Sequence, residues 1–152
     1  MRVYTAAAVL LWVALLAGGA SAATVAPWIV VTGAWSRPAI GTGVVYLRIV
    51  NRGGKPDRLD AARTPVAKVV ELHRSMDGSG SMDGMKMTGV MSMERVNAVT
   101  VPARGSVTFA PGGYHLMAIG LRGDLHPKER FPVQLHFAAA GWTSVTVTVR
   151  PI

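Results

Sequence analysis

The feature that most constrains the fold is a two-residue alternation of apolar and polar side chains along much of the chain. The run Thr143 to Arg150 reads TSVTVTVR, with valine at every second position. Successive side chains of a β-strand point to opposite faces, so this pattern is typical of a strand with one buried face. No segment after residue 22 has a helical period. Similar runs, separated by Gly- and Pro-rich turns, occupy 43–51, 67–73, 114–121 and 131–138. We therefore expect an all-β fold, an antiparallel sandwich or barrel.

Weaker patterns predict further strands. Trp28 to Pro38 ends at a proline, as a short edge strand does. Residues 59–62 carry a weak strand signal, 90–101 a longer one, and 106–110 a short one. In the 90–101 segment, Met91, Met93 and Arg95 would share one face because they lie two residues apart.

The N-terminus has the pattern of a secretory signal peptide. Arg2 precedes an apolar run from Ala6 to Ala17, and Ala20-Ser21-Ala22 is a small-residue cleavage site. The run is too short to span a membrane. We predict cleavage after Ala22, a signal peptide at 1–22 and one domain at 23–152. With no cysteine there is no lipobox, so we expect a soluble protein in the periplasm.

The absence of cysteine and the basic charge exclude several classes of protein. Without cysteine there can be no disulfide framework, blue-copper site, thiolate zinc site or iron–sulfur cluster. The formal net charge is +8, or +7 once Arg2 leaves with the signal peptide. An exported protein does not read chromosomal nucleic acid, so we expect no nucleic-acid partner. The charge favours solubility, or steering toward an acidic partner or an anionic membrane surface.

Methionine is concentrated in one polar segment. Of the eight methionines, six fall between Met76 and Met93, among Gly, Ser, Asp and Lys, and Ser-Met-Asp-Gly occurs twice there. Methionine usually fills gaps in a core, but this composition is that of a loop, which has no core to fill. Thioether sulfur together with imidazole is a ligand set suited to Cu(I). We therefore interpret this region as copper-binding.

A set of four candidate ligands lies around this segment. His115 and Met117 are two residues apart on an expected strand, so their side chains point to the same side. His73 ends a second expected strand, and Met93 lies on a third. Two nitrogens and two sulfurs in a tetrahedral arrangement would suit Cu(I). Thioethers also form no disulfides and lose no proton on binding, which fits an oxidising compartment.

These residues resemble the motif of the periplasmic copper chaperones called PCu(A)C, H(M)x10Mx21HxM. Met93 and His115 are separated by the family's 21 residues, and His115-Leu-Met117 is similar to its HxM. His73 resembles the first ligand, but 19 residues separate it from Met93 where the family has 10. The duplicated Ser-Met-Asp-Gly region accounts for the nine extra residues. Further similarity, at Trp35-Ser-Arg-Pro and Pro111-Gly-Gly-Tyr-His-Leu-Met among others, extends over most of 33–150.

The resemblance implies a single-domain, cupredoxin-like antiparallel β-sandwich of Greek-key type. It also implies a metallochaperone that binds Cu(I) through His73, Met93, His115 and Met117. The copper would pass, directly or with a Sco-type protein, to the binuclear copper site in cytochrome c oxidase subunit II. Composition and spacing alone indicate only an exported, cysteine-free, β-rich protein with a His/Met cluster.

Other side chains have weaker functional interpretations. Glu71 is either a hydrogen-bond partner for a metal-bound imidazole or a solvated charge. His126 and His136 are expected to be solvated surface residues. Met91 is interpreted first as a packing residue. The other methionines of the segment either lie in a loop without function or bind a second copper ion, as Cu(I) or Cu(II). Together they form an auxiliary set of Met76, Met82, Met85, Met87 and Met91.

Three alternative functions stay open. An enzyme is not expected, because no Gly-x-Ser-x-Gly, His-Glu-x-x-His or persuasive carboxylate pair is present. Copper sequestration without a dedicated recipient is the main alternative to delivery, with the methionine-rich loop as the store. A β-sandwich interaction module without metal is the third. Several bound copper ions without transfer would indicate sequestration, and no metal binding would leave the interaction module.

Overall fold

The computed structural model describes residues 28–76, 81–82, 85–86 and 92–151, and every regular element within these ranges is a β-strand. The all-β expectation is confirmed. In the first half of the chain the strands are β1 (Ile29–Ser36), β2 (Thr42–Asn51), β3 (Asp57–Arg63), β4 (Ala67–Met76), β5 (Ser81–Met82) and β6 (Met85–Lys86). In the second half they are β7 (Ser92–Arg95), β8 (Val99–Val101), β9 (Ser106–Phe109), β10 (Tyr114–Leu121), β11 (Arg130–Phe137) and β12 (Gly141–Val149).

Two sequence predictions concern the N-terminus. The proposed signal peptide and its boundary at residue 22 lie outside the described residues, and so stay predictions. In the part of the chain that the structure describes, there is no helix with the length and apolar character needed to cross a membrane.

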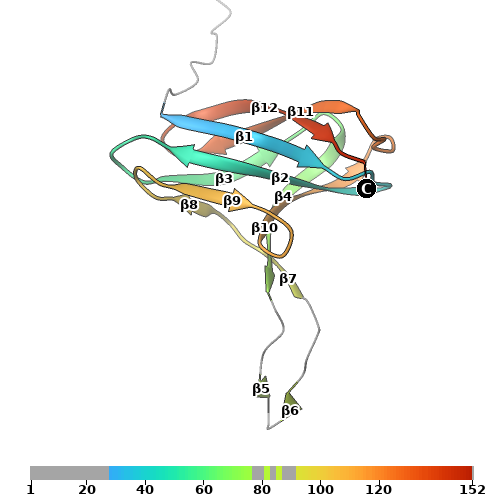
Figure 1. The fold of residues 1–152 in the computed structure, drawn as a ribbon, viewed down its shortest axis with the longest axis horizontal. Helices are drawn as coiled ribbons and strands as arrows, with labels where there is room; N and C mark the ends of the chain where they lie inside the picture. Colours follow the sequence, from blue (N-terminus) through green and yellow to red (C-terminus); the bar gives the residue numbers. More distant parts are fainter. Residues whose placement is uncertain (1–27, 77–80, 83–84, 87–91, 152) are drawn as a thin grey trace, which may run out of the picture.

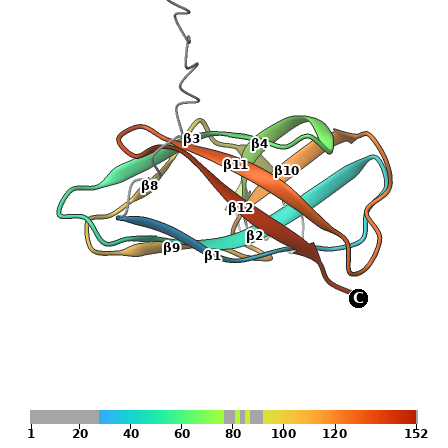
Figure 2. The same cartoon turned by 90° about the horizontal axis from the view of Figure 1, so that it is seen from above.

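Ten strands form one sheet that folds over on itself. Their order is β7-β4-β10-β9-β2-β1-β12-β11-β3-β8, and further pairings join β3 to β4 and β2 to β10. Figure 2 shows β11 and β12 crossing over β2 and β10, so the sheet makes the two layers of a sandwich. Most pairs are antiparallel, although β1 pairs with β12 and β9 with β10 in parallel. β5 and β6 form a separate two-stranded sheet, away from the sandwich in Figure 1.

The apolar face of each alternating strand fills the space between the layers. Leu72 of β4 and Leu116 of β10 are directly opposite each other and buried. They pack in one cluster with Leu47, Phe109, Leu135 and Val147, among others. Because a one-residue slip would turn these leucines toward solvent, the core fixes the β4–β10 register. The residues next to this pair along both strands are therefore also held in place.

Two details differ from the sequence predictions. β1 is not an edge strand, because it pairs with β2 on one side and with β12 on the other. The single strand expected over 90–101 is two strands, β7 and β8, with residues 96–98 between them. β7 pairs with β4 and β8 with β3, so the chain changes partner at this point and the ladder must break.

Candidate metal centre

The two histidines of the predicted ligand set lie directly opposite each other on neighbouring strands. His73 of β4 is the register partner of His115 of β10. Their ring centroids are 5.8 Å apart, with a 40° angle between the ring planes. The Leu72–Leu116 pair beside them points into the core, so the imidazoles lie on the outer face of the sheet. His115 is nevertheless only 3% exposed.

The ring of His115 is oriented by a backbone carbonyl. Its Nδ1 lies 3.1 Å from the carbonyl oxygen of Gly113. A carbonyl oxygen can only accept, so Nδ1 donates, and the neutral ring carries its lone pair on Nε2. The same oxygen also accepts a hydrogen bond from the backbone N–H of Ser75 at 3.1 Å. One atom therefore holds both the imidazole and the end of the β4–β10 ladder.

The ring of His73 is oriented by a carboxylate. Its Nε2 lies 2.9 Å from Oε2 of Glu71, and the other oxygen of Glu71 lies 3.3 Å from Nη1 of Arg95. The hydrogen bond with His73 lowers the pKa of Glu71; burial acts in the opposite direction, and the charge of Arg95 lowers this pKa further. The ionised carboxylate accepts a hydrogen bond from Nε2–H, which leaves the lone pair of a neutral His73 on Nδ1.

Each imidazole thus presents one unpaired nitrogen. Nδ1 of His73 and Nε2 of His115 are buried, and neither has a hydrogen-bond partner among the described residues. A buried polar atom without a partner costs about 1–3 kcal/mol, and such atoms are rare in folded proteins. Histidines that bind metals commonly have this arrangement, in which the second ring nitrogen donates to a carboxylate or a carbonyl. The pair is chemically suited to hold a cation.

The two methionines of the predicted set lie on the same face as the histidines. Met117 is two residues beyond His115 and opposite Glu71. Met93 of β7 pairs with Ser75, which is two residues beyond His73 on β4. Met93 is 58% exposed and Met117 half-buried. In the described part of the chain no three His, Asp or Glu side chains gather around a metal position, so further protein ligands here would be thioethers.

The auxiliary methionines are placed differently. Met76 is opposite Ser92 at the end of the β4–β7 ladder and is 43% exposed. It is three residues from His73, so the strand alternation turns it to the other face. Met82 and Met85 are register partners in the β5–β6 pair. Met87 and Met91 lie outside the described residues, so their roles stay predictions.

Two contacts of this centre do not follow from the sequence. The Gly113 carbonyl and the Arg95–Glu71 ion pair depend on backbone direction and cross-strand register, and the sequence shows neither. A weak signal exists for Arg95, because it follows Met93 by two residues and shares its strand face. Glu71, for which the sequence allows either a partner of His73 or a solvated charge, does contact His73.

The remaining histidines are remote from the pair. His136 of β11 is not the solvated side chain that the sequence predicts, because its Nδ1 lies 2.6 Å from Asp60 and its ring 4.9 Å from that of Trp142. Its side chain is 33% exposed, so it belongs to a partly covered cluster rather than to open solvent. His126 is exposed, as expected.

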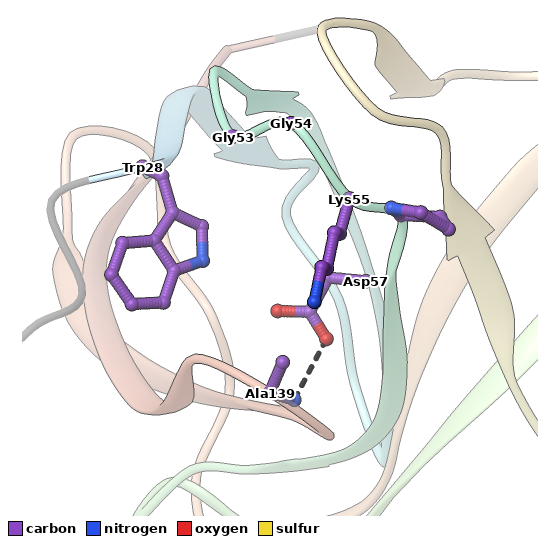
Figure 3. Close-up of a pocket in the computed structure, with 7 residues that line it drawn as sticks. Trp28, Gly53, Gly54, Lys55, Asp57 and Ala139 are labelled. Atoms are coloured by element: carbon purple, nitrogen blue, oxygen red, sulfur yellow. Dashed lines mark hydrogen bonds between the residues drawn. The ribbon is translucent and has the colours of Figure 1, made fainter.

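A separate pocket of about 290 Å³ contains none of the candidate ligands (Figure 3). Its carboxylate, on Asp57, accepts hydrogen bonds from the backbone N–H groups of Arg58, Ala139 and Ala140. These hydrogen bonds compensate the negative charge of the Asp57 carboxylate and hold the turn after β11 in place, so Asp57 has a structural role. The lining residues are Trp28, Gly53, Gly54, Lys55, Pro56, Asp57 and Ala139.

Comparisons with known proteins agree with this architecture. The model of the family described as "Putative lipoprotein LpqE-like" matches residues 25–149. The protein named "Putative lipoprotein Lxx21020" of Leifsonia xyli subsp. xyli (strain CTCB07) is 26% identical over 122 residues, covering 79% of this chain and 68% of that protein.

Solved structures show the same fold. The solution structure of CuI-DR1885 from Deinococcus radiodurans is 31% identical, with a TM-score of 0.59, and covers 86% of this chain and 83% of that one. The copper-bound PCuAC domain from PmoF2 has a TM-score of 0.63 at 21% identity, covering 82% of this chain and 94% of that domain. The predicted cupredoxin-like sandwich is thereby confirmed. The chain belongs to the LpqE-like family, and its predicted membership of the PCuAC family is confirmed.

Proposed function

We propose that the chain binds one Cu(I) ion through His73, Met93, His115 and Met117. The observation that carries this proposal is the pair of buried imidazole nitrogens without hydrogen-bond partners in the described residues. Two thioether side chains lie on the same sheet face. Two neutral nitrogens and two neutral sulfurs form a soft set that suits a monovalent copper ion. DR1885, the 31% identical relative, was solved as its Cu(I) form, which supports the assignment.

We further propose that the bound ion is cargo and that the protein is an exported, periplasmic metallochaperone rather than an enzyme. Met93, one of the four proposed ligands, is on β7, at the end of the strand order, and is 58% exposed. A ligand in that position can be displaced by an incoming thiolate or thioether without opening the core. The proposed recipient is the binuclear copper site of cytochrome c oxidase subunit II, reached directly or with a Sco-type protein.

A Cu(I) titration against a competing chelator, followed by X-ray absorption, tests the binding site. We expect one tightly bound ion whose first shell contains both sulfur and nitrogen. A shell with only nitrogen and oxygen would exclude the methionines. Delivery is tested separately by transfer to an acceptor. Several bound ions without transfer would instead support copper sequestration, the alternative function that the methionine-rich segment suggests.

Replacing Glu71 by glutamine should weaken Cu(I) binding by roughly 10–100-fold, the usual effect of removing a partner that orients a metal-binding histidine. The introduced glutamine would retain much of the shape of the glutamate side chain but lose its charge. Affinity should be measured at pH 7 by chelator competition. In both proteins it should fall on acidification, because protons compete with the metal for the imidazole lone pairs. Equal affinities at pH 7 would show that Glu71 does not orient the ligand.

The same substitution has a defined effect on the pH dependence of folding. The pKa of Glu71 is lower in the folded protein than its ordinary value of 4.5. A carboxyl group of this kind stabilises the folded state above its unfolded pKa, and the stabilisation disappears as the pH falls through the folded pKa. In urea titrations of the metal-free proteins, the stability difference between the wild type and Glu71→Gln should therefore be present at about pH 5. Below pH 4.5 it should shrink.

A further inference from the structure

Four apolar side chains lie beside the two histidines on the solvent-facing side of the sheet. Val69 of β4 is opposite Ile119 of β10, and Met117 of β10 is opposite Val44 of β2. All four lie on the same face as His73 and His115. Val69 is four residues from His73 on β4, and Met117 and Ile119 are two and four residues from His115 on β10, so their side chains point to the same side. Val44 is on that face as well, because it is directly opposite Met117. Val69 is 50% exposed, and the other three are half-buried. We name these four residues the docking face.

The opposite layer of the sandwich shows what such positions ordinarily carry. Along β12 the outward positions after Trp142 are Ser144, Thr146 and Thr148. Polar side chains are the expected choice on the wet face of an antiparallel sheet. The docking face departs from this rule, and it does so beside the candidate metal centre. An apolar, partly exposed surface next to a functional centre is typical of a protein-binding site.

The border of the docking face is cationic. Arg95 of β7 is in register with His73, and Arg48 of β2 shares its strand face with Val44. Arg150 lies 4.9 Å above the ring of Trp35, which pairs with Tyr46 of β2. On these outward strand positions of β2, β4, β7 and β10, the one carboxylate among the described residues is Glu71, which is already paired with Arg95.

We propose that the docking face receives a copper-accepting partner protein whose contact surface is apolar at its centre and acidic at its border; the inference rests on the proposed copper delivery. The apolar centre would exclude water around the ion during exchange. Complementary charges at the border accelerate encounter and select the partner. A second copy of this chain fits less well, because a two-fold interface would bring arginine borders of like charge together.

The test compares Cu(I) transfer from three proteins to two acceptors. The proteins are the wild type, Val69→Glu and Thr146→Glu, the last adding the same charge to an outward position of β12. The acceptors are the reduced, copper-free soluble domain of cytochrome c oxidase subunit II and neocuproine, an uncharged small chelator that needs no docking face. Val69→Glu should slow transfer to the protein domain by at least about tenfold and leave removal by neocuproine unchanged. Thr146→Glu should change neither rate.

The other outcomes overturn separate statements. A wild-type rate for Val69→Glu with the protein domain, or an equal slowing with neocuproine, would overturn the docking face. If the wild type transfers no copper to the domain while neocuproine still removes it, the partner and the delivery function both fail, while copper binding itself is judged by the titration above. A wild-type dimer in sedimentation that Val69→Glu dissociates would assign the face to a second copy, and would overturn the acidic partner.

Discussion

Replacing His115 by phenylalanine should abolish the stabilisation of the protein by Cu(I) without destabilising the metal-free form. A ligand at about 1,000 times its dissociation constant stabilises the folded state by about 4.1 kcal/mol, and this gain should disappear. The metal-free protein should keep its stability within about 1 kcal/mol, because an unpaired buried nitrogen is removed and the somewhat larger phenyl ring keeps the site filled. The Gly113 carbonyl keeps a donor, the backbone N–H of Ser75.

Urea unfolding measures both quantities when it is done without Cu(I) and with free Cu(I) buffered at about 1,000 times the dissociation constant of the wild type. The matched control is His136→Phe, which removes a histidine from the other layer together with its contact to Asp60. That variant should still be stabilised by copper. A His115→Phe protein that copper stabilises as strongly as the wild type would show that His115 is not a ligand. A large loss of stability in the metal-free form would show that the imidazole of His115 also has a structural role, through its Nδ1 hydrogen bond or its packing.

Deleting Ser79 to Met87 should leave the tight copper site intact and remove a weaker one. The deletion restores the family's 10-residue spacing between His73 and Met93 and removes Met82, Met85 and Met87. The β4–β7 ladder that positions Met93 ends at the Met76–Ser92 pair, outside the deleted segment. Thioethers tethered near a site raise the local ligand concentration without forming a fixed shell. The wild type should therefore bind a second copper weakly, or exchange the first more quickly.

The measurement is a Cu(I) titration with chelator competition, followed by the rate of transfer to an acceptor. The deletion should lower the stoichiometry or slow the transfer, and keep the tight affinity within about tenfold, or about 1.4 kcal/mol. A nine-residue Gly/Ser replacement of the same segment separates loop length from sulfur content, and should behave like the deletion. Loss of the tight site in both variants would mean that a loop methionine, and not Met93, is a ligand.

Much of the fold could be predicted because the alternation in this chain is strong. Val45, Leu47 and Ile49, or Val147 and Val149, are buried as their two-residue period predicts. The period does not state which strand pairs with which. For that reason the sequence suggests an edge position for β1, which pairs on both sides, and a single strand over 90–101, whose halves join different neighbours. Pairing is decided by long-range packing, and no local pattern records it.

The sequence predicts four candidate ligands, of which the structure places His73 opposite His115, but it does not predict the hydrogen bonds of the two rings. The interval between Met93 and His115 and the HxM pair pointed to the four side chains. Which ring nitrogen of each histidine is free depends on the Gly113 carbonyl and the Glu71 carboxylate. The first is a backbone atom whose direction follows from the turn before β10. The second reaches His73 because both residues lie on the same face of β4.

The two imidazoles present different nitrogens, and this determines where an ion would rest. In a histidine side chain, Nδ1 is nearer to the backbone than Nε2. Because His73 offers Nδ1 and His115 offers Nε2, an ion shared between them should lie off-centre, closer to the β4 backbone than to that of β10. β7 borders β4 on the side away from β10. The proposed ion would therefore be displaced toward the rim of the sheet, where one sulfur ligand could leave and another enter while both imidazoles stay bound.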